Sequence, residues 1–319
     1  MTFLGPSVLI ATLAVQSSPA DSLRLLALRL PESALVVESR ARPLAVREAV
    51  AEALAHNELD AARRLAAAHA VAWQDPFLVR EVARFAAWPP QRRAAKVWAD
   101  SVRRAGVAAF GRDGPAAAIA IWRRALARSR AISDTAGIAA VSGNIGAGFL
   151  EEGELDSAAA YLESARRLAV LVGDVRVEAN AVGSLAGIRE EQGDLEPARE
   201  SYLRALALRE RIGDTRGMAA DHNNLGGLAQ TLGDLDEARR QFETALAMNR
   251  REGRDDVAAT NLVNLGGLAS LDGDFTRAEG LYRDALATWR AGEQWADVAD
   301  ALTRLPWQET ACGKQTESC

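Results

Sequence analysis

Residues 214–253 read DTRGMAADHNNLGGLAQTLGDLDEARRQFETALAMNRREG, and this stretch decides the fold. The residues before it, 174–213, follow the same pattern as DVRVEANAVGSLAGIREEQGDLEPARESYLRALALRERIG. The residues after it, 254–292, follow it again as RDDVAATNLVNLGGLASLDGDFTRAEGLYRDALATWRAG. A fixed period of this size indicates stacked supersecondary units, none of which can bury its apolar face alone.

Gly-Asp pairs mark the ends of the expected helices, for example at Gly193-Asp194, Gly213-Asp214 and Gly233-Asp234. A Gly just past a helix supplies the left-handed residue that ends it, and an Asp beside it caps the next helix. About 17 residues remain between two such pairs, which corresponds to a helix of roughly 26 Å. Each repeat is therefore expected to be an antiparallel pair, with a first and a second helix.

Side chains recur in fixed columns of these pairs. One second-helix column holds a large residue, the column three residues later holds Ala, and one first-helix column holds Gly. The columns are Trp122, Leu162, Tyr202, Phe242 and Tyr282; Ala125, Ala165, Ala205, Ala245 and Ala285; and Gly106, Gly146, Gly226 and Gly266, with Ala186 in place of the fifth Gly. Because Gly within a helix costs about 1 kcal/mol relative to Ala, its recurrence predicts a close helix contact that a Cβ would block.

These residues resemble the tetratricopeptide repeat, whose pattern is met by Leu225-Gly226, Ala238, Phe242 and Ala245. The forty-residue period is similar to the longer-helix subclass that recognises peptides in cell-polarity adaptors and bacterial regulators. The resemblance implies an all-α fold, a right-handed α-solenoid of stacked antiparallel helix pairs. It also implies a scaffold for partners, although one such fold serves many functions.

The N-terminal residues 1–20 are expected to be a secretory signal peptide. An apolar run, Val8–Val15, is too short to cross a membrane, and it ends in the small residues Ser18-Pro19-Ala20. No Lys or Arg precedes the run, so the alternative is a docked N-terminal segment of a cytoplasmic protein. We favour export to the periplasm of a bacterium, with no integral membrane span.

The remaining chain is expected to form three parts. Residues 21–90 predict an irregular helical cap with a divergent helix pair, and Trp73, Trp88 and Trp98 are expected to fill its contact with the first repeat. Residues 91–305 predict an array of about five repeats plus a partial last helix, and residues 306–319 a disordered tail. The pattern stops in mid-helix, which indicates either an early stop or the truncated form of a longer architecture. Its apolar edge predicts a possible route to a homodimer, through Leu302, Leu305 and Trp307.

Composition and the reactive residues argue against an enzyme. The net charge of −5 and the pI near 5.5 do not favour nucleic acid, whose binders usually carry a basic stripe. His56, His69 and His222 have no converging ligand pattern, so no metal is expected. Cys312 and Cys319 lie in the polar tail without an activating base, where export would let them pair as a disulfide. We expect no catalysis and no cofactor.

The resemblance supplies the candidate site, because tetratricopeptide proteins bind partners in a concave groove lined by first helices. The matching positions chosen here are Glu151, Asn180, Glu190, Glu191, Asn223, Gln230 and Thr231. Asn180 and Asn223 are expected to hydrogen-bond a peptide or partner helix in both directions. The three Glu residues favour a basic segment, and the Lys and Arg of the family's clamp for a terminal carboxylate are absent.

Two other functions remain open. The layout of an export signal, a helical cap and long-period repeats is similar to the N-terminal region of bacterial CHAT-domain proteins. That resemblance implies the regulatory arm of a caspase-like cysteine peptidase, whose catalytic domain is missing from this sequence. A bacterial regulator that senses a signalling peptide is a further alternative, but the Ala-rich residues 44–110 show no basic recognition helix.

Overall fold

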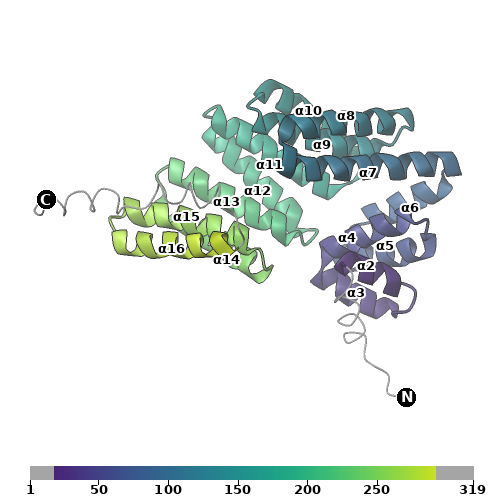
Figure 1. Ribbon diagram of the computed structural model, residues 1–319, viewed down its shortest axis with the longest axis horizontal. Coiled ribbons are helices and arrows are strands. Elements are labelled where there is room, and N and C mark those ends of the chain that lie inside the picture. The colour runs from purple at the N-terminus through teal and green to yellow at the C-terminus, as the bar shows by residue number, and fades with distance from the viewer. Residues whose placement is uncertain (1–17, 292–319) are drawn as a thin grey trace, which may run out of the picture. The chain divides into compact units, whose positions relative to one another are not determined.

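The structure is a computed structural model that describes residues 18–291. These residues form fifteen α-helices and contain no strand (Figure 1). The cap comprises α2 (Pro19–Leu26), α3 (Glu32–Ala41), α4 (Pro43–Ala55), α5 (Leu59–Trp73) and α6 (Phe77–Ala87). The array comprises five pairs, α7 (Pro90–Asp113) with α8 (Pro115–Ala131), α9 (Thr135–Glu151) with α10 (Leu155–Val172), α11 (Val175–Glu191) with α12 (Leu195–Glu210), α13 (Thr215–Thr231) with α14 (Leu235–Arg251), and α15 (Asp255–Leu271) with α16 (Phe275–Ala291).

The expected all-α architecture of helix pairs packed on their sequence neighbours is confirmed, and it is typical of a tetratricopeptide solenoid. The chain divides into two compact units. The first contains the cap, the array as far as Gln192, and Ala207–Asp214. The second contains Gly193–Leu206 and the chain from Thr215 onward.

The turns between helices follow the expected Gly-Asp chemistry. Gly173 and Gly233 have φ values of 74° and 82°, which a Cβ would disfavour. The carboxylate of Asp174 accepts a hydrogen bond from the backbone N–H of Val177 at 3.3 Å. Asp234 does the same for the N–H of Glu237 at 3.0 Å. Each Gly-Asp pair thus ends one helix and caps the next.

The Gly column marks the close helix contact that the sequence predicts. A Cβ on Gly106 would lie 2.2 Å from the Trp122 indole, and one on Gly226 would lie 2.7 Å from the Phe242 ring. Trp122 and Phe242 are buried. The large residue of each second helix therefore fills the space that the missing Cβ leaves on the first helix.

The cap has a hydrophobic core of its own, which includes Leu23, Leu65 and Phe85. One helix of the cap, α3, is missing from the sequence-based expectation. Pro31 is the N-cap residue of α3, and Pro43 is the first residue of α4.

The expectation for the three Trp residues of this region is wrong for Trp98. Trp88 lies in the cap core, and Trp73 donates its indole N–H to the Ser39 carbonyl at 2.8 Å. Trp98 instead lies on α7 with 43% of its surface exposed.

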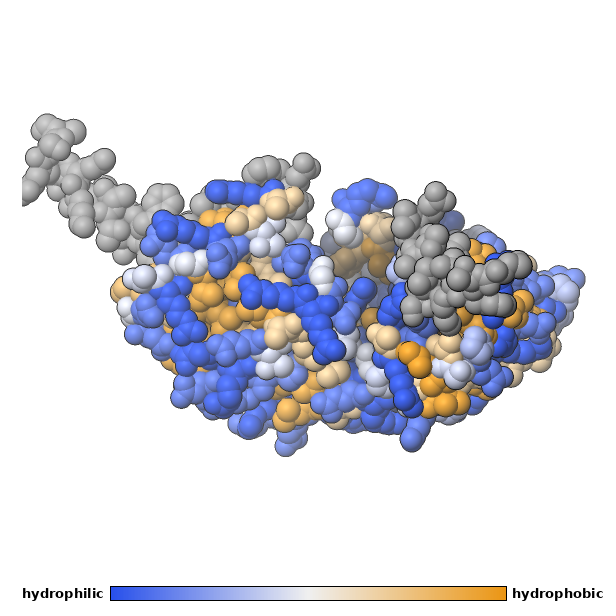
Figure 2. All heavy atoms as spheres, turned by 90° about the horizontal axis from the view of Figure 1, so that it is seen from below, coloured by the Kyte–Doolittle hydropathy of each residue, from blue (hydrophilic) through white to orange (hydrophobic). Residues whose placement is uncertain are grey.

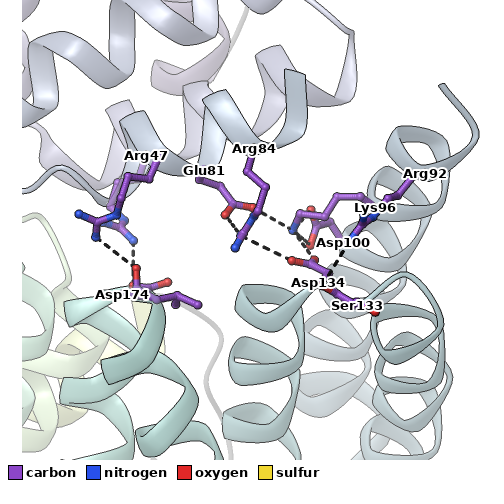
Figure 3. A network of polar contacts seen from close by, with 11 residues as sticks. Arg47, Glu81, Arg84, Arg92, Lys96, Asp100, Ser133, Asp134 and Asp174 are labelled. Atoms are coloured by element: carbon purple, nitrogen blue, oxygen red, sulfur yellow. Dashed lines mark hydrogen bonds and ion pairs between the residues drawn. The ribbon is translucent and has the colours of Figure 1, made fainter. Parts of the chain in front are cut away.

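Buried ion pairs join the cap to the array, as Figure 3 shows. Lys96 Nζ on α7 lies 3.0 Å from Asp134 Oδ2, in the turn before α9, and 3.0 Å from Asp100 Oδ2. Arg84 on α6 pairs with Glu81 and lies 3.6 Å from Asp134 Oδ1. Lys96 and Asp134 are both buried. The turn before α9 therefore shares its carboxylate between a cap cation and an array cation.

The next turns of the array also contact the cap, within the same unit. Arg47 on α4 lies 3.2 Å from Asp174 Oδ1, and Arg80 donates to the Val172 carbonyl at 3.1 Å. A Cβ on Gly213 would lie 2.2 Å from the Trp73 indole. The cap thus lies along three turns that recur every forty residues.

Hydrophobic residues on the face shown in Figure 2 form separate patches within a mainly hydrophilic surface. None of the helices within residues 18–291 combines the length and the apolar character needed to cross a membrane. Most of the expected signal peptide, the C-terminal edge with Leu302, Leu305 and Trp307, and both Cys residues lie outside the described residues.

Candidate functional site

Four of the predicted site residues lie in the first unit, with Glu151, Glu190 and Glu191 at the ends of α9 and α11 and Asn180 in the first half of α11. Glu151 and Glu191 are exposed, and Glu190 is half-buried. Asn180 is exposed, but its Oδ1 accepts a hydrogen bond from Arg209 Nη1 at 3.0 Å. This unit therefore exposes the carboxylates of Glu151 and Glu191, while the amide oxygen of Asn180 already has a partner.

The other three predicted residues lie in the second unit, on α13. Asn223 and Gln230 are half-buried, and Thr231 is exposed. The Thr231 hydroxyl donates to the Gly227 carbonyl of its own helix at 3.1 Å. Asn223 is the residue of this group that other helices hold in place.

Asn223 ends a relay of amide side chains that crosses the second unit. Asn249 Nδ2 on α14 donates to Asn261 Oδ1 on α15 at 2.8 Å, and Asn261 Nδ2 donates to Asn223 Oδ1 at 2.9 Å. Asn264 Nδ2, one turn along α15, donates to the same Asn223 oxygen at 2.9 Å. Asn249 and Asn261 are each only 1% exposed, so the relay is built into the packing of three helices.

Arg254 fixes the direction of this relay. Its Nη1 lies 3.4 Å from Asn249 Oδ1, and a guanidinium donates hydrogen bonds but accepts none. Asn249 must therefore turn its oxygen to Arg254 and its Nδ2 to Asn261, and the same orientation passes on to Asn223. The bonds leave Asn223 Nδ2, a donor, and Asn264 Oδ1, an acceptor, without a partner among the described side chains.

Sequence reasoning missed the polar column beside the one it chose. The neighbouring first-helix column holds Asn144, Ser184, Asn224 and Asn264, and all four are half-buried. In the column chosen from the sequence, Gly183 and Val263 are buried. Recurrence of Asn at forty-residue spacing was the signal that would have found Asn144, Asn224 and Asn264.

Groups with strongly perturbed pKa values lie elsewhere, within the cap and at the cap contact of Figure 3. Burial, and then the Arg47 guanidinium, lower the pKa of His69 to about 3. Burial raises the pKa of Glu81 although Lys96 and Arg84 oppose it. Burial alone would lower the pKa of Lys96, but Asp100, Asp134 and Glu81 outweigh it and hold that pKa above its ordinary value. Perturbed groups of this kind suit either a catalytic site or structural ion pairing, and here Lys96 Nζ lies 3.7 Å from Glu81 Oε1 in such a pair.

A sequence model of the tetratricopeptide repeat matches residues 177–251 and 218–291. No curated protein matches this chain.

Solved structures with related folds add to this match. A Rap protein complexed with Competence and Sporulation Factor is 16% identical, with a TM-score of 0.59 over 86% of this chain and 80% of that chain. The apo form of RapI is 15% identical, with a TM-score of 0.54 over 64% and 74%. A signal transduction ATPase with a tetratricopeptide repeat sensor, from Pyrococcus horikoshii, is 15% identical, with a TM-score of 0.55 over 83% and 42%. Identities this low show a likeness of fold alone. The sequence match and the shared fold show that this chain contains tetratricopeptide repeats.

Proposed function

We propose that this chain is a non-catalytic scaffold that binds a peptide or a partner helix on the exposed side of α13 and α15. The observation that carries the proposal is the amide relay that ends at Asn223 and Asn264. Tetratricopeptide repeats serve protein binding in general, and one fold neighbour was solved with Competence and Sporulation Factor bound.

The chemistry of the relay matches a peptide backbone. Each peptide unit offers one N–H donor and one carbonyl acceptor. Asn264 Oδ1 offers an acceptor and Asn223 Nδ2 offers a donor, and both amides belong to one hydrogen-bonded group. Because buried Asn261 holds Asn223, and Asn223 in turn holds Asn264, the two side chains lose little rotamer freedom on binding. A prepared donor and acceptor recognise backbone, while sequence preference comes from the side chains around them.

The carboxylates of the first unit support a preference for a basic ligand. Glu151 and Glu191 are exposed near the ends of first helices, as the candidate site requires. Reversing one of these charges should weaken the binding of a basic peptide and leave the binding of a neutral one unaffected, because exposed charges favour a ligand of opposite charge.

The test begins with selection of peptides from a random displayed library on the full chain. Affinity of each selected peptide is then measured by fluorescence anisotropy for the natural chain, for Asn223→Leu and for Asn264→Leu. We expect at least about a fivefold loss of affinity for both variants, since an unpaired backbone group at the contact costs about 1–3 kcal/mol. Thr244→Leu is the control, because Thr244 is exposed on the second helix α14 of the same pair.

Two results would count against this function. Selected peptides that bind Asn223→Leu and Asn264→Leu as tightly as the natural chain would move the site away from the relay. A library that yields no peptide above background would argue against peptide recognition altogether. Circular dichroism should show that the variants keep their helices, so that a loss of binding is not a loss of fold.

Several finer expectations belong to the same proposal. The forty-residue period favours the long-helix subclass of these repeats. Nothing in the matches described above supports the link to CHAT-domain proteins, so that alternative rests on the layout of the sequence alone. Export and a homodimer through the C-terminal edge also stay predictions, and sedimentation that finds only monomer at tens of micromolar would remove the dimer.

A further inference from the structure

The first helix pair of the array is strongly basic, in contrast to the chain as a whole. Residues 90–131, which form α7 and α8, hold ten Lys and Arg but only two Asp and Glu, whereas the whole chain has a net charge of −5. Four of these residues, Arg123, Arg124, Arg128 and Arg130, lie on α8 and are named here the α8 arginine face. In each of the four later second helices, the same columns hold at most two Arg. The charge is therefore a property of this pair and not of the repeat.

The α8 arginine face is exposed and is not neutralised within the protein. All four side chains are exposed, and none has an ion pair within residues 18–291. Arg on other second helices does have such partners, as Arg166 has Glu163 and Arg239 has Asp272. The four charges lie within two turns of one helix, about 10 Å. Like charges this close repel one another, so an anionic partner would relieve an unfavourable feature of the free protein.

Aromatic rings hold two of the guanidinium groups. Arg124 Cζ lies 6.0 Å from the ring centroid of Trp98 on α7. Arg123 Cζ lies 5.7 Å from the ring centroid of Phe149 on α9, which itself stacks on Tyr161 at 5.7 Å. Such a contact attracts the cation to the ring, and neither guanidinium group has an ion pair within residues 18–291. Both side chains are thereby held near a defined position before any ligand arrives.

We propose that the α8 arginine face is a second interaction surface, which binds an acidic segment of a partner protein. Its carboxylates would pair with the guanidinium groups in the planar, two-bond geometry that Arg favours. Small Ala side chains lie between the Arg residues on this side of α8, at Ala120 and Ala127, and let a partner backbone approach. The exposed part of Trp98 would receive an apolar side chain of the same segment.

The same observations favour protein over nucleic acid or membrane. Single-stranded nucleic acid needs a longer basic track that follows its backbone, but the four charges cover only two turns of α8. An interfacial helix needs a large apolar face to enter a lipid surface. The exposed side of α8 carries mainly Arg and Ala.

The test uses a short fluorescein-labelled peptide rich in Glu with interspersed Leu, and a matched peptide in which Gln replaces Glu. Binding to the full chain is followed by fluorescence anisotropy at low and at physiological salt. We expect the Glu peptide to bind and the Gln peptide to fail. The double variant Arg123→Glu and Arg130→Glu should lose at least about tenfold in affinity, because two attractive pairs become repulsive. Trp98→Ala should lower the affinity for the Glu peptide a few-fold and leave the salt dependence of that affinity unchanged.

The last repeat supplies the matched control. Arg283→Glu and Arg290→Glu change the same two columns on α16 and alter the net charge equally. This control should bind the Glu peptide like the natural chain, and an equal loss in both double variants would overturn the proposal in favour of a net-charge effect. Arg123→Gln and Arg130→Gln provide a milder second variant, which places no Glu near the end of α8. Tighter binding of poly(dT) or of phosphatidylserine vesicles than of the Glu peptide, lost in the same variants, would overturn the choice of partner.

Discussion

Lys96→Met tests whether buried ion pairs hold the cap to the array. Lys96 is 8% exposed and Asp134 is 1% exposed. The ammonium lies 3.0 Å from a carboxylate oxygen of Asp134, 3.0 Å from one of Asp100 and 3.7 Å from one of Glu81. Met fills a similar volume but carries no charge, so the substitution leaves these carboxylates without their shared cation and adds little cavity.

The expected loss of stability in Lys96→Met depends on the cation that remains beside Asp134 and Glu81. Removing one member of a buried ion pair typically costs about 3–5 kcal/mol, because the other charge stays buried. Arg84 still lies 3.6 Å from Asp134 and still pairs with Glu81, so the lower end, about 3 kcal/mol, is expected for the first unit. Adding Asp134→Asn removes the stranded charge and should recover part of this loss.

The pH dependence of the stability lost in Lys96→Met gives an independent test. Burial already raises the pKa of Glu81, and Lys96 is the first of the charges that oppose the rise. Without Lys96 that pKa rises further, so the folded variant takes up a proton that the unfolded chain does not hold. A carboxyl with a raised folded pKa loses stability as pH rises from its unfolded pKa, about 4.3, through the folded value. The difference between variant and natural chain should therefore shrink as pH falls from 8 to 5.

Hydrogen exchange with mass spectrometry on the full chain measures this effect locally. The opening free energy of α6 and α7 should fall, while that of α15 and α16 in the second unit should not. Arg112→Met is the control, because Arg112 lies on the same helix in an exposed pair with Asp113. A loss below about 1 kcal/mol in α6 and α7, or a deficit that grows as the pH falls, would refute the reasoning.

Two further predictions concern packing and protonation. Gly226→Ala should cost about 1–3 kcal/mol of stability by overpacking, since its Cβ would lie 2.7 Å from Phe242. A Cβ at Gly227 meets nothing within 4 Å, so Gly227→Ala should stabilise α13 by up to about 1 kcal/mol. Thermal unfolding of the two adjacent variants compares them directly. Burial, and then Arg47, hold the pKa of His69 at about 3, so the stability that depends on its neutral ring is present above the unfolded pKa of about 6.5 and is lost as pH falls toward 3. His69→Gln should make the urea midpoint of unfolding depend less on pH between pH 7 and 4. An unchanged pH dependence would contradict the role given to the neutral His69 ring.

The sequence predicts the repeat well because its determinants are local and recur. Gly226 and Phe242 meet within one helix pair, and Gly-Asp turns such as Gly233-Asp234 need only adjacent residues. The same columns appear in each repeat, so a single chance match carries little weight.

The cap could not be predicted in the same way. Its contacts join Arg47 and Arg84 to turns far along the chain, and an isolated Arg gives no sign of which carboxylate it will meet. Pro31 gives no clear sign of α3, because a Pro can stand at the start of a helix as well as after its end.

The candidate site was predicted in its helix but not in its orientation. A helical face is wide enough that either of two adjacent columns could be exposed to solvent. In the packed repeats Asn264 is half-buried, whereas Val263 is buried. The orientation of Asn223 depends on Arg254 through two buried amides, which is a property of three packed helices and not of a motif.

During synthesis on the ribosome, the contacts between the cap and the array cannot all form at the same time. Most contacts in a repeat array join neighbours, so each pair can pack soon after it emerges. The contact of Arg47 with Asp174 instead spans 127 residues. At 5–20 residues per second, the cap would wait roughly 6 to 25 seconds for that turn. During this interval the part of the cap that later meets the turn at Asp174 lacks that contact. A chaperone would therefore be most useful to the nascent cap at this stage.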